Sequence, residues 1–264
     1  MYNFNYHQAK NVDDASKLVT GVEEGKLMAG GMTLIPTLKM RLAKPSDVVD
    51  LGKIADLKGI KKDGNNIVIG AMTRHFDVAN SDVVKSAIPG LAGLAAHIGD
   101  PAVRNRGTIG GSIANNDPAA DYPSAVVALN ATVITNKRKI AGDEFFKGMF
   151  ETALQDGEIV TAVSFPIPEK SAYMKFPNPA SRYAIVGVYV AKTGSNVRVA
   201  VTGAGPVVFH QKDMEAALSK SFTPDAIKGI AQKQDGLNAD IHASAEYRAH
   251  LVNVMARRAV TAAG

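Results

Sequence analysis

Two glycine pairs are the first residues whose type and spacing could do chemistry, and that chemistry is anion binding. One pair, Gly110-Gly111, lies within residues 99–121, GDPAVRNRGTIGGSIANNDPAAD, and the other, Gly30-Gly31, lies within residues 27–36, LMAGGMTLIP. Glycine lets the backbone turn tightly, and bare N–H groups in such a turn can approach a phosphate closely. The two pairs therefore predict one extended phosphate-bearing ligand, held at two places. The alternative interpretation is that each pair is an ordinary tight turn.

Side chains that could perform catalysis are few. Asp117 and Asp121 could act as paired carboxylates in acid–base work, although Asp121 is equally suited to cap the helix that is predicted after it. The stretch VAVTGAGP opens like the dinucleotide fingerprint G-x-G-x-x-G, but Pro206 and Val208 break the pattern, which indicates a strand-ending turn. A chain that is rich in binding backbone and poor in catalytic side chains indicates that a cofactor performs the chemistry.

The composition excludes several classes of protein. The chain has no cysteine, so disulfides and thiolate-held zinc or iron–sulfur centres are excluded from it. No H-E-x-x-H motif is present, and we expect no metal site. The net charge is +5, but the basic residues are scattered and are not interleaved with aromatic ones, which argues against nucleic-acid binding. Apolar runs of about 18 residues and a signal peptide are both missing, so we expect no membrane span. We expect a cytoplasmic protein, either free or at the inner face of the membrane.

The elements that must position the glycine pairs belong to three units of a mixed α+β fold. Residues 1–55 form a small N-terminal α/β unit in which three strands alternate with two helices. Asp13 or Asp14 begins the first helix and Thr33 begins the second. The strands are expected at 3–7, 26–29 and 47–51.

Two larger units follow. Residues 56–168 read as an α+β middle domain, with a hairpin at Asp63-Gly64 and a helix capped by Thr73. Residues 169–264 read as a C-terminal domain with a three-stranded antiparallel sheet and helices. The last helix carries a basic surface that is a candidate for docking partner subunits; its residues are Arg248, Arg257 and Arg258.

Four stretches resemble one protein family over nearly the whole chain. They are AGGMTLIP (29–36), IGAMTRH (69–75), HIGDPAVRNRGTIGGSIANNDPAADYP (97–123) and SAEYRAHLVNVMARRAV (244–260). The sequence resembles the FAD-binding medium subunit of molybdenum hydroxylases, the xanthine dehydrogenase family, and most of all that of aerobic carbon monoxide dehydrogenase-type enzymes. The resemblance implies a three-domain FAD-binding fold of the PCMH (vanillyl-alcohol-oxidase-like) type, with FAD between the first two domains.

The resemblance also implies which residues contact FAD, and it implies no catalytic side chain and no metal ligand on this chain. One diphosphate loop would comprise Ala29, Gly30, Gly31, Met32, Thr33 and Leu34. The second would comprise Thr108, Ile109, Gly110, Gly111, Ser112 and Asn115. Ile98 would line the adenine and Asp121 would contact the adenosine half. From the third unit, Ile159 or Val160, Lys175 and Tyr183 would approach the flavin.

Two residues depart from the family's pattern. Met32 stands where histidine or glutamine is usual, which removes a side-chain hydrogen bond. Arg182 precedes Tyr183, where the family often has aspartate, so the local charge near the flavin differs.

The implied function is that of an electron-transfer flavoprotein subunit with non-covalent FAD. Its partners would be a large molybdopterin subunit and a small [2Fe–2S] subunit, in a dimer of heterotrimers. Electrons from the iron–sulfur clusters would pass through FAD to quinone, NAD or oxygen. The alternatives are a stand-alone FAD oxidase or reductase of related fold, and a nucleotide-binding scaffold subunit without a redox role.

Overall fold

The N-terminal unit is built on a parallel three-stranded sheet. In the computed structural model, which describes residues 1–264, the sheet order is β1-β3-β2. Its elements are β1 (Asn5–Gln8), α1 (Val12–Thr20), β2 (Gly25–Met28), α2 (Leu34–Lys39) and β3 (Asp47–Asp50). Asn11 caps α1, because its Oδ1 accepts a hydrogen bond from the Asp14 amide at 2.8 Å. The prediction that Asp13 or Asp14 is the cap is therefore wrong.

The middle unit contains a five-stranded antiparallel sheet in the order β4-β5-β10-β6-β7. These strands are β4 (Ile60–Asp63), β5 (Asn66–Gly70), β6 (Thr132–Thr135), β7 (Lys139–Ala141) and β10 (Val160–Pro166). The hairpin at Asp63-Gly64 is confirmed, since Asp63 pairs with Asn66. Strand β10 is the last of the five in sequence but lies in the middle of the sheet, between β5 and β6. The sheet is therefore complete only when residues 160–166 pair with strands that lie far earlier in the chain.

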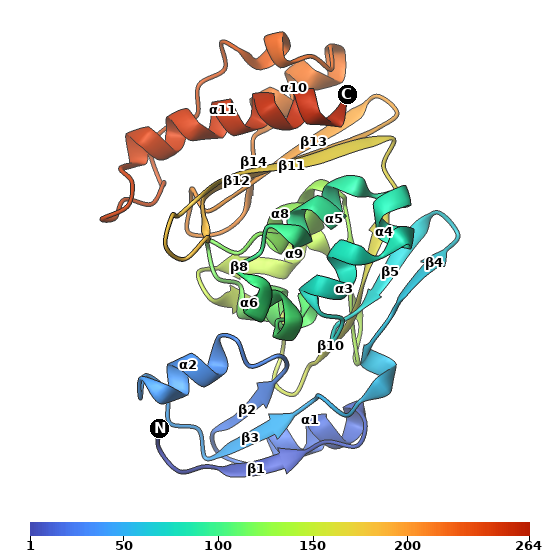
Figure 1. The fold of residues 1–264 in the computed structure, drawn as a ribbon, viewed down its shortest axis with the longest axis vertical. Helices are drawn as coiled ribbons and strands as arrows, with labels where there is room; N and C mark the ends of the chain where they lie inside the picture. The colour runs from blue at the N-terminus through green and yellow to red at the C-terminus, as the bar shows by residue number, and fades with distance from the viewer.

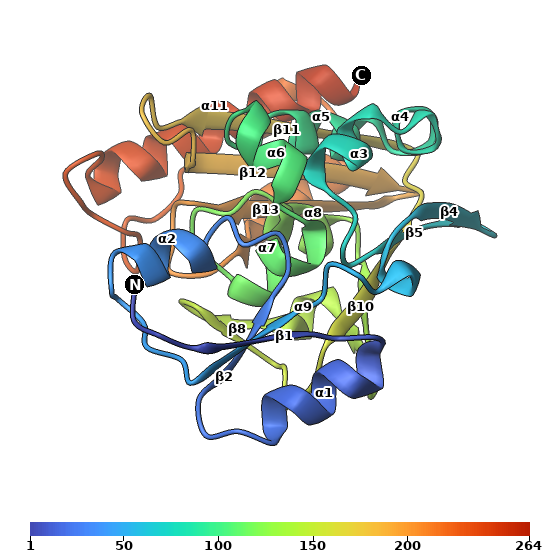
Figure 2. The same ribbon diagram turned by 60° about the horizontal axis from the view of Figure 1, so that its bottom comes forward.

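Helices cover this sheet and carry the glycine-rich stretch (Figures 1 and 2). They are α3 (His75–Asn80), α4 (Asp82–Ala87), α5 (Pro89–Ala96), α6 (Pro101–Arg106), α7 (Ile109–Asn115), α8 (Tyr122–Ala128) and α9 (Gly142–Phe145). The short turn η1 (Ala55–Leu57) enters the unit, and the small hairpin β8 (Phe146–Gly148) and β9 (Glu151–Thr152) follows α9. Thr73 caps no helix, because its hydroxyl bonds to the amide and carbonyl of Gly59 and α3 begins after Arg74.

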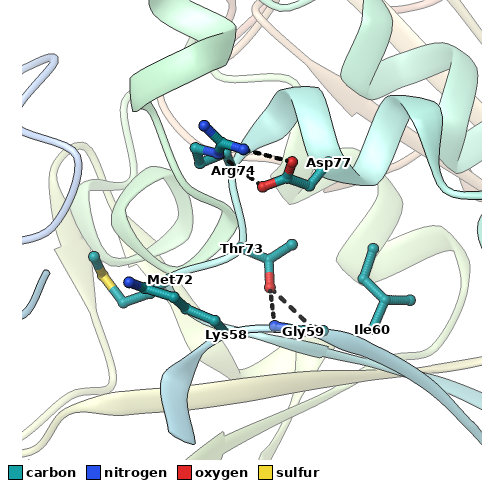
Figure 3. A pocket seen from close by; sticks show the side chains of 7 residues that line it. All are labelled: Lys58, Gly59, Ile60, Met72, Thr73, Arg74 and Asp77. Atoms are coloured by element: carbon teal, nitrogen blue, oxygen red, sulfur yellow. Dashed lines mark hydrogen bonds and ion pairs between the residues drawn. The ribbon is translucent and has the colours of Figure 1, made fainter. Parts of the chain in front are cut away.

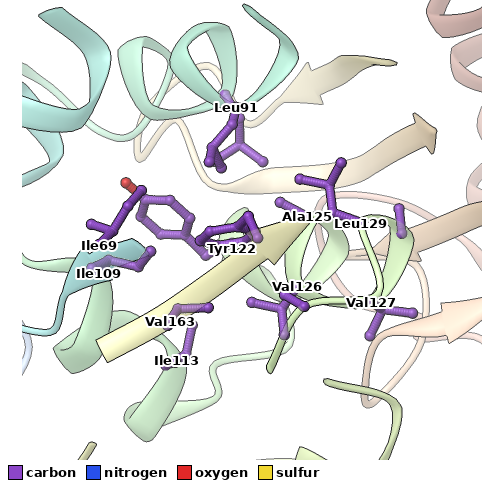
Figure 4. Packing of buried hydrophobic residues seen from close by; sticks show 14 of the residues in the cluster. Ile69, Leu91, Ile109, Ile113, Tyr122, Ala125, Val126, Val127, Leu129 and Val163 are labelled. Atoms are coloured by element: carbon purple, nitrogen blue, oxygen red, sulfur yellow. The ribbon is translucent and has the colours of Figure 1, made fainter. Parts of the chain in front are cut away.

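The largest core lies between these helices and the sheet (Figure 4). Tyr122 at the start of α8 is fully buried there, among Ile69, Ile109 and Val163. Its ring centroid is 5.4 Å from that of His75, which is also buried. The Tyr122 hydroxyl and His75 Nδ1 have no hydrogen-bond partner, so both rings act as apolar packing groups.

The C-terminal unit is a four-stranded antiparallel sheet between two layers of helices (Figure 1). Its elements are β11 (Lys170–Pro177), β12 (Ala184–Thr193), β13 (Asn196–Thr202), β14 (Phe209–His210), α10 (Lys212–Lys220), η2 (Pro224–Ile227) and α11 (Ala245–Ala263). The prediction of three strands missed β14, which has two residues and no alternating pattern. Helices α10 and α11 pack on one face and α5 and α8 on the other, so β12 is apolar on both faces. The mixed α+β class is confirmed.

Arg248 is part of the core of this unit. Its guanidinium donates to the carbonyls of Ile185 at 2.6 Å and Gly203 at 3.0 Å, and to Asp240 Oδ2 at 2.7 Å. The residue is buried, and of the three predicted docking arginines only Arg258 is exposed. The prediction of a basic docking surface that includes Arg248 is therefore wrong. No helix of the chain combines the length and the apolar character that a membrane crossing requires.

Candidate cofactor site

The loop between β2 and α2 presents a run of unpaired backbone amides. Six consecutive N–H groups there donate to no acceptor of the protein. They belong to Ala29, Gly30, Gly31, Met32, Thr33 and Leu34. Gly31 has a φ of +75°, which suits glycine, and its carbonyl accepts the hydrogen bond that begins α2. Successive amides without partners form a concave site for an anion, as the sequence predicts for this loop.

The second glycine pair is organised differently. Gly110 and Gly111 lie in the first turn of α7 and do not form the predicted turn. The Ile109 amide donates to the Thr73 carbonyl at 3.1 Å and the Gly110 amide to the Ala71 carbonyl at 2.8 Å. The Gly111 amide donates to the Thr108 hydroxyl at 3.2 Å, which caps the helix. The prediction of bare amides at this pair is therefore wrong.

Residues 71–74 supply the acceptors that bind the start of α7. Thr73 is fixed by Gly59, whose amide donates to the Thr73 hydroxyl at 3.0 Å, and Arg74 pairs with Asp77 at 2.8 Å (Figure 3). The same segment lines a surface pocket of about 480 Å³ together with Lys58 and Ile60. None of the predicted FAD contacts lines this pocket. The segment IGAMTRH therefore supports the start of α7 through these hydrogen bonds.

The two glycine segments lie against each other. A Cβ on Gly30 would come within 1.9 Å of the Arg106 carbonyl oxygen. A Cβ on Gly111 would come within 3.2 Å of the Ala29 Cβ. In Figure 2 the chain between β2 and α2 passes beside α7. Glycine at these positions thus permits a close approach of two loops that are about 80 residues apart in the chain.

Tyr183 brings the C-terminal unit to the same place. It lies in the loop between β11 and β12 and is 45% exposed. Burial raises the pKa of Tyr183, the charges of Asp117 and Asp121 add to the rise, and the nearby Thr33 side chain opposes it. Residues of all three units therefore meet around the loop of free amides.

Asp121 and Lys175 form an ion pair behind this point. The side chain of each is 5% exposed, and the distance from Lys175 Nζ to Asp121 Oδ2 is 3.0 Å. The Tyr173 hydroxyl donates to the other carboxylate oxygen. Burial raises the pKa of Asp121, and Lys175 and Tyr173 oppose that rise. Asp121 makes no side-chain capping bond to α8, so the capping interpretation is wrong.

The remaining predicted contacts are spread over the molecule. Ile98 is partly buried at the edge of the middle core. Ile159 and Val160 lie at the start of β10 and are buried, Ile159 in the N-terminal core and Val160 in the middle core. Their assignment to the third unit is therefore wrong. Ser112 and Asn115 lie on α7 and are partly exposed.

Asn116 was missed by the sequence reasoning. It ends α7 in the left-handed conformation, with φ +44°, and its side-chain amide donates to the carbonyls of Gly148 at 2.7 Å and Glu151 at 2.8 Å. The β8–β9 hairpin is thereby tied to the glycine-rich stretch. Asparagine at a helix C-terminus was the available signal.

Comparison with known proteins shows what this arrangement belongs to. Residues 2–168 match the family described as "FAD binding domain in molybdopterin dehydrogenase", and residues 171–263 match "CO dehydrogenase flavoprotein C-terminal domain". The chain is 35% identical to the glyceraldehyde dehydrogenase medium chain of Sulfolobus acidocaldarius, over 97% of this chain and 96% of the relative. It is 33% identical to the carbon monoxide dehydrogenase medium chain of Hydrogenophaga pseudoflava, over 98% and 96%.

Solved structures agree with the sequence comparison. A chain of carbon monoxide dehydrogenase from Hydrogenophaga pseudoflava superposes with a TM-score of 0.87 at 32% identity, covering 99% of this chain and 97% of that one. A chain of reconstituted CO dehydrogenase from Oligotropha carboxidovorans gives 0.89 at 31% identity, covering 99% and 98%. As its motifs predict, this chain belongs to the family of FAD-binding medium subunits of molybdenum hydroxylases, and it is an oxidoreductase subunit whose cofactor is FAD.

Proposed function

We propose that this chain is the electron-transfer subunit of a three-subunit molybdenum hydroxylase of the carbon monoxide dehydrogenase type. The chemistry that FAD supplies when bound is reversible electron transfer, here between the [2Fe–2S] clusters of a small partner subunit and an external acceptor such as quinone, NAD or oxygen. A large molybdopterin subunit would oxidise the substrate. The names of the relatives, medium chain and medium subunit, support partners of both sizes.

The observation that carries the proposal is the run of six free amides at 29–34. A diphosphate has two negative charges and several acceptor oxygens, and it requires donors without nearby bulk or negative charge. These amides meet that requirement, and the loop rests on α7, where Thr108 and Ser112 add hydroxyl groups. We propose that residues 1–55 and 56–168 enclose FAD between them, with the diphosphate at this loop.

Further residues of this chain would orient the cofactor. Ile98 would contact the adenine with its apolar side chain, and the Tyr183 ring would cover one face of the flavin and limit access of solvent and acceptor. Tyr183 is suited to this because it is half exposed, next to Thr33 of the amide loop, and carried by residues 169–264. Asp117, which is partly exposed, would contribute an acceptor for a hydroxyl group of the cofactor, whereas the carboxylate of Asp121 is buried and already bonded to Lys175 and Tyr173.

The test compares flavin content in two glycine variants. In Gly111→Val the added Cβ would press on Thr108 and Ala29, whereas in the control Gly93→Val the added Cβ would meet nothing within 4 Å on an exposed helix face. We expect folded Gly111→Val with at least about tenfold less flavin per chain. The new side chain would displace the amide loop at Ala29, and each hydrogen bond that this loop loses to a phosphate costs about 1.5–3 kcal/mol. Full flavin content in Gly111→Val would show that the loop only turns the chain.

Purification of the native complex tests the rest of the proposal. Acid precipitation is expected to release the yellow flavin into the supernatant, since the chain has no cysteine for a thioether bond. Native mass spectrometry with metal analysis is expected to find two further subunits, molybdenum and iron, in a dimer of heterotrimers. Reduction of the isolated chain by substrate would favour a stand-alone oxidase or reductase instead, and a chain without flavin would favour a scaffold.

A further inference from the structure

Lys175 uses every hydrogen-bond donor that it has on the protein itself. Its ammonium lies 3.0 Å from Asp121 Oδ2, 2.8 Å from the His97 carbonyl oxygen and 3.0 Å from the Arg182 carbonyl oxygen. A lysine ammonium has three N–H donors, and these three oxygens satisfy all of them. The side chain is 5% exposed. No donor is left for a cofactor, although the sequence resemblance assigns Lys175 to the flavin.

The two carbonyl groups that Lys175 binds precede two residues of the candidate site. His97 ends α5 and is followed by Ile98, and Arg182 is followed by Tyr183. The two backbone segments come from different units, the middle one and the C-terminal one. One buried ammonium therefore joins the segment of Ile98 to the segment of Tyr183.

The loop that carries Tyr183 depends on this bond. Arg182 has a φ of +62°, a backbone conformation that residues other than glycine rarely adopt without support. Two backbone bonds close the loop on itself: the Asn178 amide donates to the Tyr183 carbonyl at 2.8 Å, and the Arg182 amide donates to the Asn178 carbonyl at 2.9 Å. The Arg182 guanidinium also reaches the Gly99 carbonyl, at 3.5 Å, which is the limit for a hydrogen bond. Lys175 links this loop to the middle unit, because its ammonium donates to the Arg182 carbonyl and also pairs with Asp121.

We infer that Lys175 is a positioning residue that holds Ile98 and Tyr183 in register without touching the cofactor. The inference rests on the proposed function in that it gives these two residues their roles. It is distinct from a cofactor-contacting role for Lys175, because the two roles predict different effects on the loop. In a positioning role the loop loosens when the ammonium is removed, even when no flavin is bound.

Trypsin gives a direct readout, because it cleaves the peptide bond after arginine. At Arg182 the carbonyl of that peptide bond is the one that accepts the hydrogen bond from Lys175. Lys175→Met alone would leave Asp121 as a buried unpaired charge and could unfold the chain. The variant to use is therefore the double substitution Lys175→Met/Asp121→Asn. The matched control is Lys192→Met, on the neighbouring strand β12, where the lysine pairs with the exposed Glu169.

The first measurement uses full-length protein from which flavin has been removed. We expect cleavage after Arg182, identified by fragment mass, to be about tenfold faster in the double variant than in the unaltered chain, because local opening becomes easier. Lys192→Met is expected to match the unaltered chain. Unaltered cleavage at Arg182 in a folded double variant would overturn the inference. This result does not depend on FAD, so a failure of the proposed function would be seen separately.

The second measurement uses the same proteins after FAD is added back. Positioning predicts that FAD occupancy stays within about twofold of the unaltered chain, since the diphosphate loop is intact, while the visible circular dichroism of the flavin changes as Tyr183 moves. A large loss of FAD occupancy with unchanged cleavage at Arg182 would mean that Lys175 contacts the cofactor directly.

Discussion

Gly30 is the residue of the candidate site with the least room for a side chain. The obstacle is the Arg106 carbonyl oxygen, 1.9 Å from where a Cβ would lie, and this oxygen belongs to the backbone and cannot swing away. The left-handed conformation in this loop belongs to the next residue, Gly31. Steric contact between two loops therefore selects glycine at position 30, and conformation selects it at position 31.

Gly30→Ala is expected to destabilise the chain by about 2 kcal/mol, the usual cost of overpacking a tight contact. Gly93→Ala is the control, because nothing lies within 4 Å of the added Cβ and alanine favours the helix. Urea denaturation of the two variants checks this. Equal midpoints would mean that the two loops separate at no cost.

His75 makes the stability of the chain depend on pH. Burial lowers the pKa of His75 to about 4, and the charge of Arg104 adds to the effect. In the unfolded chain the pKa returns to about 6.5, so the unfolded state takes up a proton first as the pH falls. The stabilisation is therefore complete above pH 6.5 and is lost as the pH falls toward 4.

The expected loss between pH 6.5 and pH 5 is about 2 kcal/mol, and it is expected to be absent in His75→Leu. Glu158, which is buried, and Glu215, which is partly buried, have pKa values of about 2 and act only at lower pH. The free energy of unfolding, measured by urea at each pH, checks the prediction. The exposed His242→Asn serves as control and is expected to keep the pH dependence of the unaltered chain.

At the scale of elements, two threonines next to the glycine pairs, Thr33 before α2 and Thr108 before α7, differ in what they do. Thr108 accepts a hydrogen bond from the Gly111 amide and caps α7, whereas Thr33 makes no capping bond at α2. The Gly111 amide at the start of α7 is thus bonded within the protein, whereas the amides at the start of α2 are free to bind a ligand. The sequence pattern, threonine near a glycine pair, is the same in both.

Thr108→Val is expected to cost about 1 kcal/mol of stability, the usual value of a helix N-cap. Thr33→Val is expected to change the stability of the flavin-free chain by less than about 0.5 kcal/mol. Thermal unfolding of both variants without flavin makes the comparison. A cost at Thr33 as large as that at Thr108 would contradict the open start of α2.

At the scale of the whole molecule, the residues of the candidate site come from all three units. The amide loop belongs to the N-terminal unit, α7 to the middle unit and Tyr183 to the C-terminal unit. The Asp121–Lys175 pair joins the last two, and so does Arg198, which donates to the Val127 carbonyl at 3.0 Å and also to Asp143. The C-terminal unit therefore has a defined position against the middle unit.

Tyr183→Ala in the assembled complex is expected to change oxidation by the acceptor at least about fivefold while reduction through the iron–sulfur clusters stays within about twofold, because the ring covers one face only. Stopped-flow absorbance of the two half-reactions at full FAD occupancy checks this. Half-reactions that are both unchanged would exclude a gating role. Tyr247→Ala, which removes another exposed tyrosine of the same unit, is the control.

The sequence by itself determined the family, the cofactor and the mixed α+β class, and it predicts that the two glycine segments hold the cofactor. Glycine pairs, hairpin signals and apolar periodicity act over a few residues, so they are visible in one dimension. The hairpin at Asp63-Gly64 and the free amides around Gly30-Gly31 follow from such local patterns.

Only the tertiary structure decided which polar groups are already satisfied. The amides of Ile109 and Gly110 bind carbonyls of Thr73 and Ala71, more than 35 residues earlier in the chain. Arg248 is buried by carbonyls of a distant strand and turn, and the donors of Lys175 are all taken. A hydrogen bond joins whichever donor and acceptor the packing of the core brings within about 3 Å, and the local sequence contains no record of that distant partner.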